Sequence, residues 1–228
     1  MTAPQQSSGQ RHFHEELAQL KQRLLDMSGH AERLVDLAIK SLLDRDREIA
    51  EQVIAGDKVL NELEVEIEER AVRLIALQQP MARDLRFLIG TIQVSSALER
   101  VGDHAVNIAE SAERLVDHGG RLTPGPAIED MAGRARAMLG DALDAFLRAD
   151  GALGREVCKA DDAVDALHDS VFRVLLTHMM ESSRNIGPAL ELLLVSRNLE
   201  RVADLATNIS EDAVYLAEGK QIKHHFED

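Results

Sequence analysis

One stretch of this chain occurs twice, and the repeat constrains the fold more than any other feature. Residues 98–112 read LERVGDHAVNIAESA, and residues 199–213 read LERVADLATNISEDA. At an offset of 101 residues, ten of these fifteen positions are identical. Chance does not give such agreement within one chain, so we interpret the protein as an internal duplication.

Apolar residues recur at alternating spacings of three and four through both halves. The series from Phe87 to Ala112 is unbroken, and the series from Leu192 to Ala213 has the same phase relative to the repeated Glu-Arg pair. Such spacing is typical of helices that pack in a bundle. No useful length of the chain alternates with period two, and aromatic residues are only 3%. The sequence therefore predicts an all-α fold, with six helices in two similar three-helix bundles.

Proline, glycine and polar clusters give the expected boundaries. We expect helices over about 13–44, 47–77, 81–117, 127–149, 152–181 and 187–218. The domain organisation that follows is a disordered tail at 1–10, a first bundle at 11–118, a linker at 119–126, a second bundle at 127–220 and a C-terminal tail at 221–228.

The composition disfavours several classes of function. A net charge of -14 argues against nucleic acid and anionic lipid as partners, and suits cations or a partner with a basic patch. Cys158 is the only cysteine, so it forms no internal disulfide, and we interpret it as a small buried hydrophobe. The chain has no run of 18 apolar residues and no signal-peptide pattern at its start. We therefore expect a cytoplasmic protein that does not insert into a membrane.

The repeated stretch carries an acidic stripe in each half. Residues four apart share one helical face, here roughly opposite the apolar seam, so we expect the stripes to be exposed or to lie in an outer groove. Like charges at this spacing repel by about 0.2–0.5 kcal/mol per pair, which suggests that a cation relieves them. Arg100 and Arg201 point about 100° away and are expected to be imperfect neutralisers. The two stripes are Glu99, Asp103 and Asn107, and Glu200, Asp204 and Asn208.

The preceding helices carry matching stripes at an offset of 104 residues: Asp57, Asn61 and Glu64, and Asp161, Asp165 and His168. In an antiparallel hairpin that turns at Pro80, Asp57 lies level with Asp103, about 30 Å from the turn. The same arithmetic places Asp161 level with Asp204. Each bundle is thus predicted to bring two oxygen-rich patches together.

Clustered carboxylates and amides with few imidazoles favour hard cations, namely iron, Mn²⁺, Mg²⁺ or Ca²⁺. The alternative is a solvated charged face. A di-iron oxidase of the four-helix type needs Glu-x-x-His, but the positions three after Glu99 and Glu200 are Gly102 and Ala203. His104 corresponds to Leu205 in the second copy, so we interpret it as a helix-surface histidine.

His168 replaces Glu64 within a stripe, and a ligand role for it stays open. The sequence contains no catalytic constellation, so we expect no enzyme. Two alternatives remain open at this point: a carboxylate-metal enzyme, either a phosphohydrolase or an oxidase, and a metal-storage or structural bundle.

The sequence resembles the PhoU family of accessory regulators of bacterial phosphate uptake. The resemblance rests on Gln79-Pro80-x-Ala82-x-Asp84-Leu85-Arg86 at the second turn and on Leu-Glu-Arg-x-x-Asp-x-x-x-Asn-Ile at 98–108 and 199–209. It covers the chain from about Phe13 to Glu218 and includes the duplication. Two departures are Asn61, where a carboxylate would complete the first stripe, and the second turn at 184–188, which lacks Asp-Leu-Arg.

The resemblance implies a function that the spacing does not show. It implies a homodimeric cytoplasmic protein that restrains the phosphate-starvation response and phosphate uptake when phosphate is plentiful. It also implies two partners, the ATPase subunit of a phosphate ABC transporter and a sensor histidine kinase. Finally, it implies metal clusters on the bundle surface, held by Glu99, Asp103, Glu200 and Asp204, with Asp57, Asp161 and Asp165 opposite.

Overall fold

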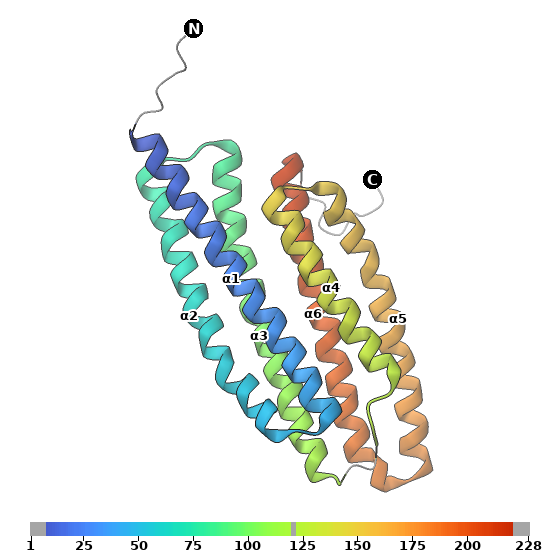
Figure 1. Ribbon diagram of the computed structural model, residues 1–228. Helices are drawn as coiled ribbons and strands as arrows, with labels where there is room; N and C mark the ends of the chain where they lie inside the picture. The colour runs from blue at the N-terminus through green and yellow to red at the C-terminus, as the bar shows by residue number, and fades with distance from the viewer. Residues whose placement is uncertain (1–7, 120–121, 221–228) are drawn as a thin grey trace.

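The structure is a computed structural model that describes residues 8–119 and 122–220. Within these ranges it contains no strand, and six long helices account for nearly all residues (Figure 1). The helices are α1 (Ser8–Asp44), α2 (Arg47–Gln78), α3 (Ala82–Asp117), α4 (Pro126–Arg148), α5 (Gly151–Glu181) and α6 (Ile186–Glu218), with a short 3-10 turn, η1 (Ser183–Asn185), before α6. The all-α prediction is confirmed.

The duplication is visible in how the helices begin. The Asp46 carboxylate accepts hydrogen bonds from the first amides of α2, including that of Glu48 at 2.9 Å. The Asp150 carboxylate, 104 residues later, does the same at the start of α5, accepting from the Ala152 amide at 3.0 Å. Both caps satisfy amides that have no partner inside the helix, so the same local chemistry starts the second helix of each half.

Helices α3 and α6 form the centre of the molecule. Helix α3 packs against α1, α2 and α6, while α6 packs against α3, α4 and α5. The helices α2, α3, α6 and α5 therefore form a layer in that order, and α1 and α4 lie on one face of it, in front in Figure 1. The α2–α3 turn and the α5–α6 turn lie at opposite ends of the molecule.

One continuous hydrophobic core runs through both halves. Phe146 of α4 is fully buried and stacks on Phe87 of α3, with ring centroids 5.5 Å apart. Gly90 leaves the room for this ring, because a Cβ there would lie 2.7 Å from Phe146 Cε2. The two three-helix units are thus joined by shared aromatic packing.

The predicted helix boundaries agree with the structure to within a residue or two, except at the N-terminus. Helix α1 begins at Ser8, so part of the expected tail at 1–10 is helical. Residues 1–7, the expected C-terminal tail at 221–228 and residues 120–121 of the expected linker lie outside the described residues. No helix in the described ranges is long and apolar enough to cross a membrane.

Candidate metal centre

The first carboxylate cluster lies between α2 and α3 and comprises Asp57, Asn61, Glu64, Glu99 and Asp103. Helices α2 and α3 are antiparallel, and their turn at 79–81 places the two stripes level as predicted. The helices approach closely at Gly102, where a Cβ would lie 2.4 Å from Leu60 Cδ1 and 2.8 Å from Asp57 Oδ1. Glycine at this position therefore lets the α2 carboxylate reach the backbone of α3.

The carboxylates of the first cluster raise one another's pKa. Burial raises the pKa of Asp57, and the Asp103 carboxylate adds to the effect, whereas a hydrogen bond from Asn61 opposes it. Asn61 Nδ2 donates to Asp57 Oδ2 at 2.9 Å, but Asp57 Oδ1 is buried without a partner. Burial also raises the pKa of Glu99, with repulsion from Asp103 and Glu64. The cluster therefore holds its negative charge at a cost in free energy.

The second carboxylate cluster lies between α5 and α6 and comprises Asp161, Asp165, His168, Glu200 and Asp204. Burial, followed by repulsion from Asp165, Asp204 and Glu200, raises the pKa of Asp161 to about 6. The pKa of Asp165 and that of Glu200 are also raised, first by burial and then by Asp204. Asp161 Oδ1 is buried without a partner, like its counterpart in the first cluster.

Arg201 neutralises the second cluster more effectively than its spacing predicts. Its Nη1 lies 2.7 Å from Asp204 Oδ2, and its Nε lies 3.6 Å from Glu200 Oε2. A helical separation of three residues brings Arg201 within reach of Asp204, which the expectation of an imperfect neutraliser overlooked. The arginine nevertheless pairs only with the two α6 carboxylates among the described contacts, and Asp161 Oδ1 has no partner.

The two clusters bring together all seven predicted ligands. Asp57, Glu99, Asp161, Glu200 and Asp204 are partly buried between their helices. The remaining two, Asp103 and Asp165, are exposed at the rim. The stripes therefore lie in the seam between each helix pair rather than opposite the core.

The donor set fits a hard cation. It offers carboxylate oxygens that repel one another, and in each cluster one buried oxygen has no partner. Among the described side chains, no three Asp, Glu, His or Cys groups converge closely enough to hold an ion as they stand. Binding would therefore require side chains to turn toward a shared point, and metal ligation stays a prediction.

The histidines and the cysteine near the clusters have other contacts. His104 Nδ1 lies 2.9 Å from Asn198 Oδ1, so this side chain links α3 to α6. His168 Nδ1 lies 2.8 Å from Ser196 Oγ, while its charge lowers the pKa of Glu200. Cys158 is buried as predicted, and burial raises the pKa of its thiol to about 11.

Sequence reasoning missed two hydroxyl groups and one acid beside the second cluster. Thr207 Oγ1 and Ser210 Oγ, which follow Asp204 on α6, are buried without partners. Glu211 is only 7% exposed, and its charge raises the pKa of the Cys158 thiol. The spacing of three from Asp204 to Thr207 was the available signal, because residues three apart share a helical face.

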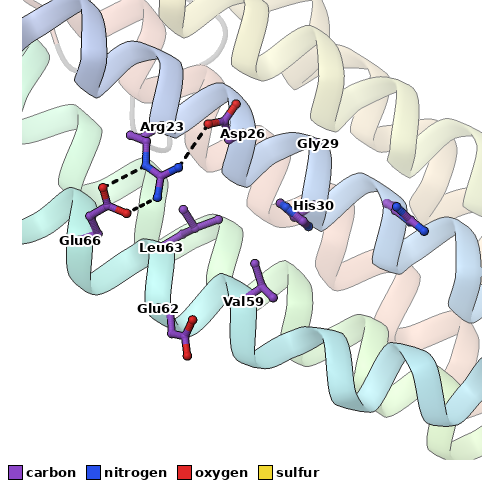
Figure 2. A pocket seen from close by; sticks show the side chains of 9 residues that line it. Arg23, Asp26, Gly29, His30, Val59, Glu62, Leu63 and Glu66 are labelled. Carbon is purple, nitrogen blue, oxygen red and sulfur yellow. Dashed lines mark hydrogen bonds and ion pairs between the residues drawn. The ribbon is translucent and has the colours of Figure 1, made fainter.

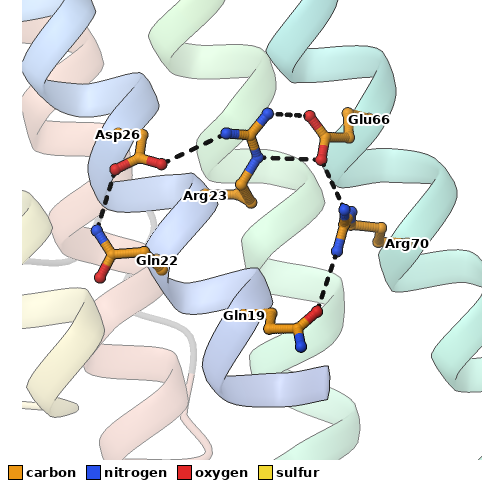
Figure 3. A network of polar contacts seen from close by, with 6 residues as sticks. All are labelled: Gln19, Gln22, Arg23, Asp26, Glu66 and Arg70. Carbon is orange, nitrogen blue, oxygen red and sulfur yellow. Dashed lines mark hydrogen bonds and ion pairs between the residues drawn. The ribbon is translucent and has the colours of Figure 1, made fainter. Parts of the chain in front are cut away.

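A separate hollow of about 540 Å³ lies between α1 and α2 (Figure 2). At one end of it, Arg23 Nε donates to Glu66 Oε1 at 3.0 Å, and Asp26 also faces the guanidinium. Arg70 reaches the same Glu66 carboxylate at 2.9 Å and extends the network (Figure 3). The charges here are paired with each other, so we interpret this network as a clamp between α1 and α2 rather than as a ligand site.

A duplicated three-helix unit with a carboxylate cluster in each copy defines a class of all-helical proteins. Comparison with known proteins identifies the family that forms this class. The model of the PhoU domain family matches residues 24–112 and again 128–213. The chain belongs to the PhoU family.

Relatives and solved structures extend over almost the whole chain. The chain is 38% identical to the "Phosphate-specific transport system accessory protein PhoU homolog" of Rhizobium meliloti, over 92% of this chain and 88% of the relative. It is 40% identical to the homolog of the same name from Aquifex aeolicus, over 92% of this chain and 94% of the relative.

Among solved structures, PhoU from Pseudomonas aeruginosa superposes with a TM-score of 0.88 at 36% identity, covering 91% of this chain and all of that one. The phosphate transport system regulatory protein PhoU from Streptococcus pneumoniae superposes with a TM-score of 0.85 at 29% identity, covering 92% of this chain and 98% of that one.

Proposed function

We propose that this protein is an accessory regulator of phosphate transport that restrains phosphate uptake and the phosphate-starvation response when phosphate is plentiful. The observation that carries the proposal is the match of both repeats to the PhoU domain. The relatives named as phosphate-specific transport accessory proteins align over most of their own length, so the likeness is not confined to one module. The role proposed is regulatory and not catalytic.

The proposed regulator acts as an adaptor in the cytoplasm. Its partners are the ATPase subunit of a phosphate ABC transporter and a sensor histidine kinase, and it works as a homodimer without inserting into the membrane or binding nucleic acid. The acidic balance of the chain, -14, supports partners that present basic surfaces.

The two carboxylate clusters are proposed to bind hard cations such as iron, Mn²⁺, Mg²⁺ or Ca²⁺. Glu99 and Asp103 with Asp57 would hold the first ion or ions. Asp161 and Asp165 would act with the α6 pair at the second cluster, Glu200 and Asp204. A bound cation would supply charge neutralisation between paired helices, and the raised pKa values of Asp57 and Asp161 support this proposal, because burial and neighbouring carboxylates oppose ionisation of both groups.

The decisive experiment measures alkaline phosphatase in a deletion strain grown in high phosphate. We expect high output that returns to the low level when the gene is restored. Unchanged output, with a redundant gene copy ruled out, would overturn the proposed role.

The metal proposal has its own test on the purified protein. A variant with Glu99→Ala, Asp103→Ala, Glu200→Ala and Asp204→Ala is compared with the parent by equilibrium dialysis against Mn²⁺. We expect the variant to lose binding. Equal binding by both proteins would remove the metal half of the proposal and leave the regulatory half standing.

A further inference from the structure

A second kind of site lies at the end of the molecule where the two halves meet, at the top in Figure 1. A cavity of about 270 Å³ opens there among the start of α1, the start of α3 and the ends of α4 and α6. Apolar residues lie between two cationic side chains and one acid in its lining. The lining residues are Leu17, Lys21, Arg83, Asp84, Phe87, Leu147, Ala149 and Leu216.

Two cations line this cavity, and a third flanks it. Lys21 Nζ lies 4.9 Å from the centre of the Phe87 ring, so a cation–π contact holds the ammonium at the cavity wall. Arg86 lies beside Gly219 at the end of α6, with its guanidinium 3.9 Å from where a Cβ of that glycine would be. Its Nε is buried without a hydrogen-bond partner. A buried donor without an acceptor is costly, and Arg86, which does not line the cavity itself, adds positive charge beside it.

In the part of the chain that the structure describes, no carboxylate forms an ion pair with these cations. Within residues 8–119 and 122–220, no ion pair joins Lys21, Arg83 or Arg86 to a carboxylate, although elsewhere Arg23, Arg114 and others are paired. The acid in the lining, Asp84, lies in the first turn of α3, where a carboxylate interacts favourably with the helix dipole. In a chain of net charge -14, a cavity lined by two such cations is suited to an anion from outside.

The internal repeat shows that this cluster exists at one end only. At an offset of 101, Arg83, Asp84 and Arg86 correspond to Arg184, Asn185 and Gly187. At that opposite end the His118 ring packs on Gly187, where a Cβ would lie 2.8 Å from its Cε1. Lys21 corresponds to Gly125 at an offset of 104. The Asp-Leu-Arg motif of the first turn, which plays no part in the carboxylate clusters, thus supplies Asp84 and Arg86 to this end, and the residue before it supplies Arg83.

We propose that this cavity binds a phosphate group through Lys21 and Arg83, with Arg86 contributing from its edge. Arginine and lysine are the side chains that recognise phosphate, and a guanidinium can do so with two parallel hydrogen bonds. Free orthophosphate and the phosphate of an ester present the same chemistry. The choice of phosphate rests on the proposed function, whereas the anionic character of the ligand rests on the cavity alone. Because α1 and α3 meet α4 and α6 here, an occupied site links both halves.

The test is isothermal titration calorimetry of the full chain with orthophosphate, and in a second arm with AMP, in EDTA so that no cation at the carboxylate clusters contributes. We expect Lys21→Gln/Arg83→Gln to weaken binding at least tenfold. The matched control is Arg184→Gln, the repeat counterpart of Arg83, which should leave the affinity unchanged. Should the double variant fail to fold, Arg83→Gln alone serves, because Arg83 is exposed.

Each outcome decides the proposal. Orthophosphate binding that is lost in the double variant supports it with free phosphate as the source, and binding of AMP alone supports it with an ester. No binding of either at millimolar concentration, or equal loss in Arg184→Gln, overturns it. This measurement on purified protein is independent of alkaline phosphatase output in the deletion strain, so failure of one proposal is distinguishable from failure of the other.

Discussion

The two carboxylate clusters differ in how their central aspartates are held. In the first, Asn61 donates a hydrogen bond to Asp57, and this opposes the rise in its pKa. In the second, the counterpart of Asn61 is Asp165, which adds repulsion and helps to raise the pKa of Asp161 to about 6. The duplication has thus produced one cluster whose central aspartate, Asp57, is partly relieved by a neighbouring amide, and one whose central aspartate, Asp161, faces a further carboxylate instead.

The helix backbones at the two clusters differ as well. Gly102 in the first half allows contact with Leu60 and Asp57, while its counterpart in the second half is the buried Ala203. The first pair of helices therefore has no room for a Cβ where the second pair accepts one. Because α3 has a glycine at this position and α6 has an alanine, the distance between the paired helices differs between the two clusters.

Gly102→Ala should have the largest effect on stability, because the new Cβ would overlap Leu60 Cδ1 at 2.4 Å. We expect a loss of about 1–3 kcal/mol in the free energy of unfolding, since overpacking outweighs the gain in helix propensity. Urea denaturation measures this change in the free energy of unfolding. The matched change, Ala203→Gly, should cost only about 1 kcal/mol. A stabilised Gly102→Ala protein would show that the two halves have the same spacing.

Asp161→Asn should stabilise the metal-free protein at neutral pH. Because the folded pKa is about 6 and the ordinary value is 3.8, the native state binds the proton more tightly, so stability falls as the pH rises through this window. The substitution should add about 1–2 kcal/mol at pH 7, less than the full shift implies because Asp161 is partly solvated.

Urea denaturation in EDTA at a series of pH values between about 4 and 7 tests this linkage. The parent should lose stability across the window, and Asp161→Asn should lose less. Asp57→Asn is the control from the first cluster and should gain less than Asp161→Asn, because Asn61 already relieves Asp57. Equal gains in the two variants would contradict the asymmetry between the clusters.

The helices and the level stripes could be predicted because they depend on spacing along the chain. The turn at Pro80 and the equal rise of two antiparallel helices suffice to place Asp57 beside Asp103. The spacing left open whether the stripes are exposed or lie in an outer groove, because the side of a helix that faces its neighbour depends on packing. The deeper burial of Asp161 follows from α5 and α6 in three dimensions and has no local signature.

The cationic cavity shows the same limit. Lys21 and Arg83 are far apart in the sequence, and neither has a pattern that marks it. They meet because α1 packs against α3, where the Lys21 ammonium lies over the Phe87 ring. The motif around Arg86 identified the family, but its contact with the end of α6 becomes visible only in the fold.

Asn61→Asp should convert the first cluster toward the second. The variant loses the hydrogen bond from Asn61 Nδ2 to Asp57 and gains a repulsive charge, so we expect a loss of about 0.5–1 kcal/mol in EDTA. In the presence of Mn²⁺ the same change should raise the affinity of the first cluster for this ion, because hard cations prefer a carboxylate to an amide. Asp165→Asn is the reciprocal control, and parallel changes in both variants would refute the comparison.

A pairwise effect is expected at the junction of α3 and α6, where His104 Nδ1 lies 2.9 Å from Asn198 Oδ1. The repeat counterparts of these residues are Leu205 and Ala97, so one half supplies a polar pair where the other supplies an apolar one. His104→Leu or Asn198→Ala alone leaves a partly buried group unpaired and should cost about 1 kcal/mol.

The double variant recreates the apolar pair and should recover part of that loss. A double-mutant cycle by urea denaturation should therefore give a coupling energy of about 0.5–1 kcal/mol. Strictly additive losses would mean that the hydrogen bond contributes nothing to the contact between the two halves.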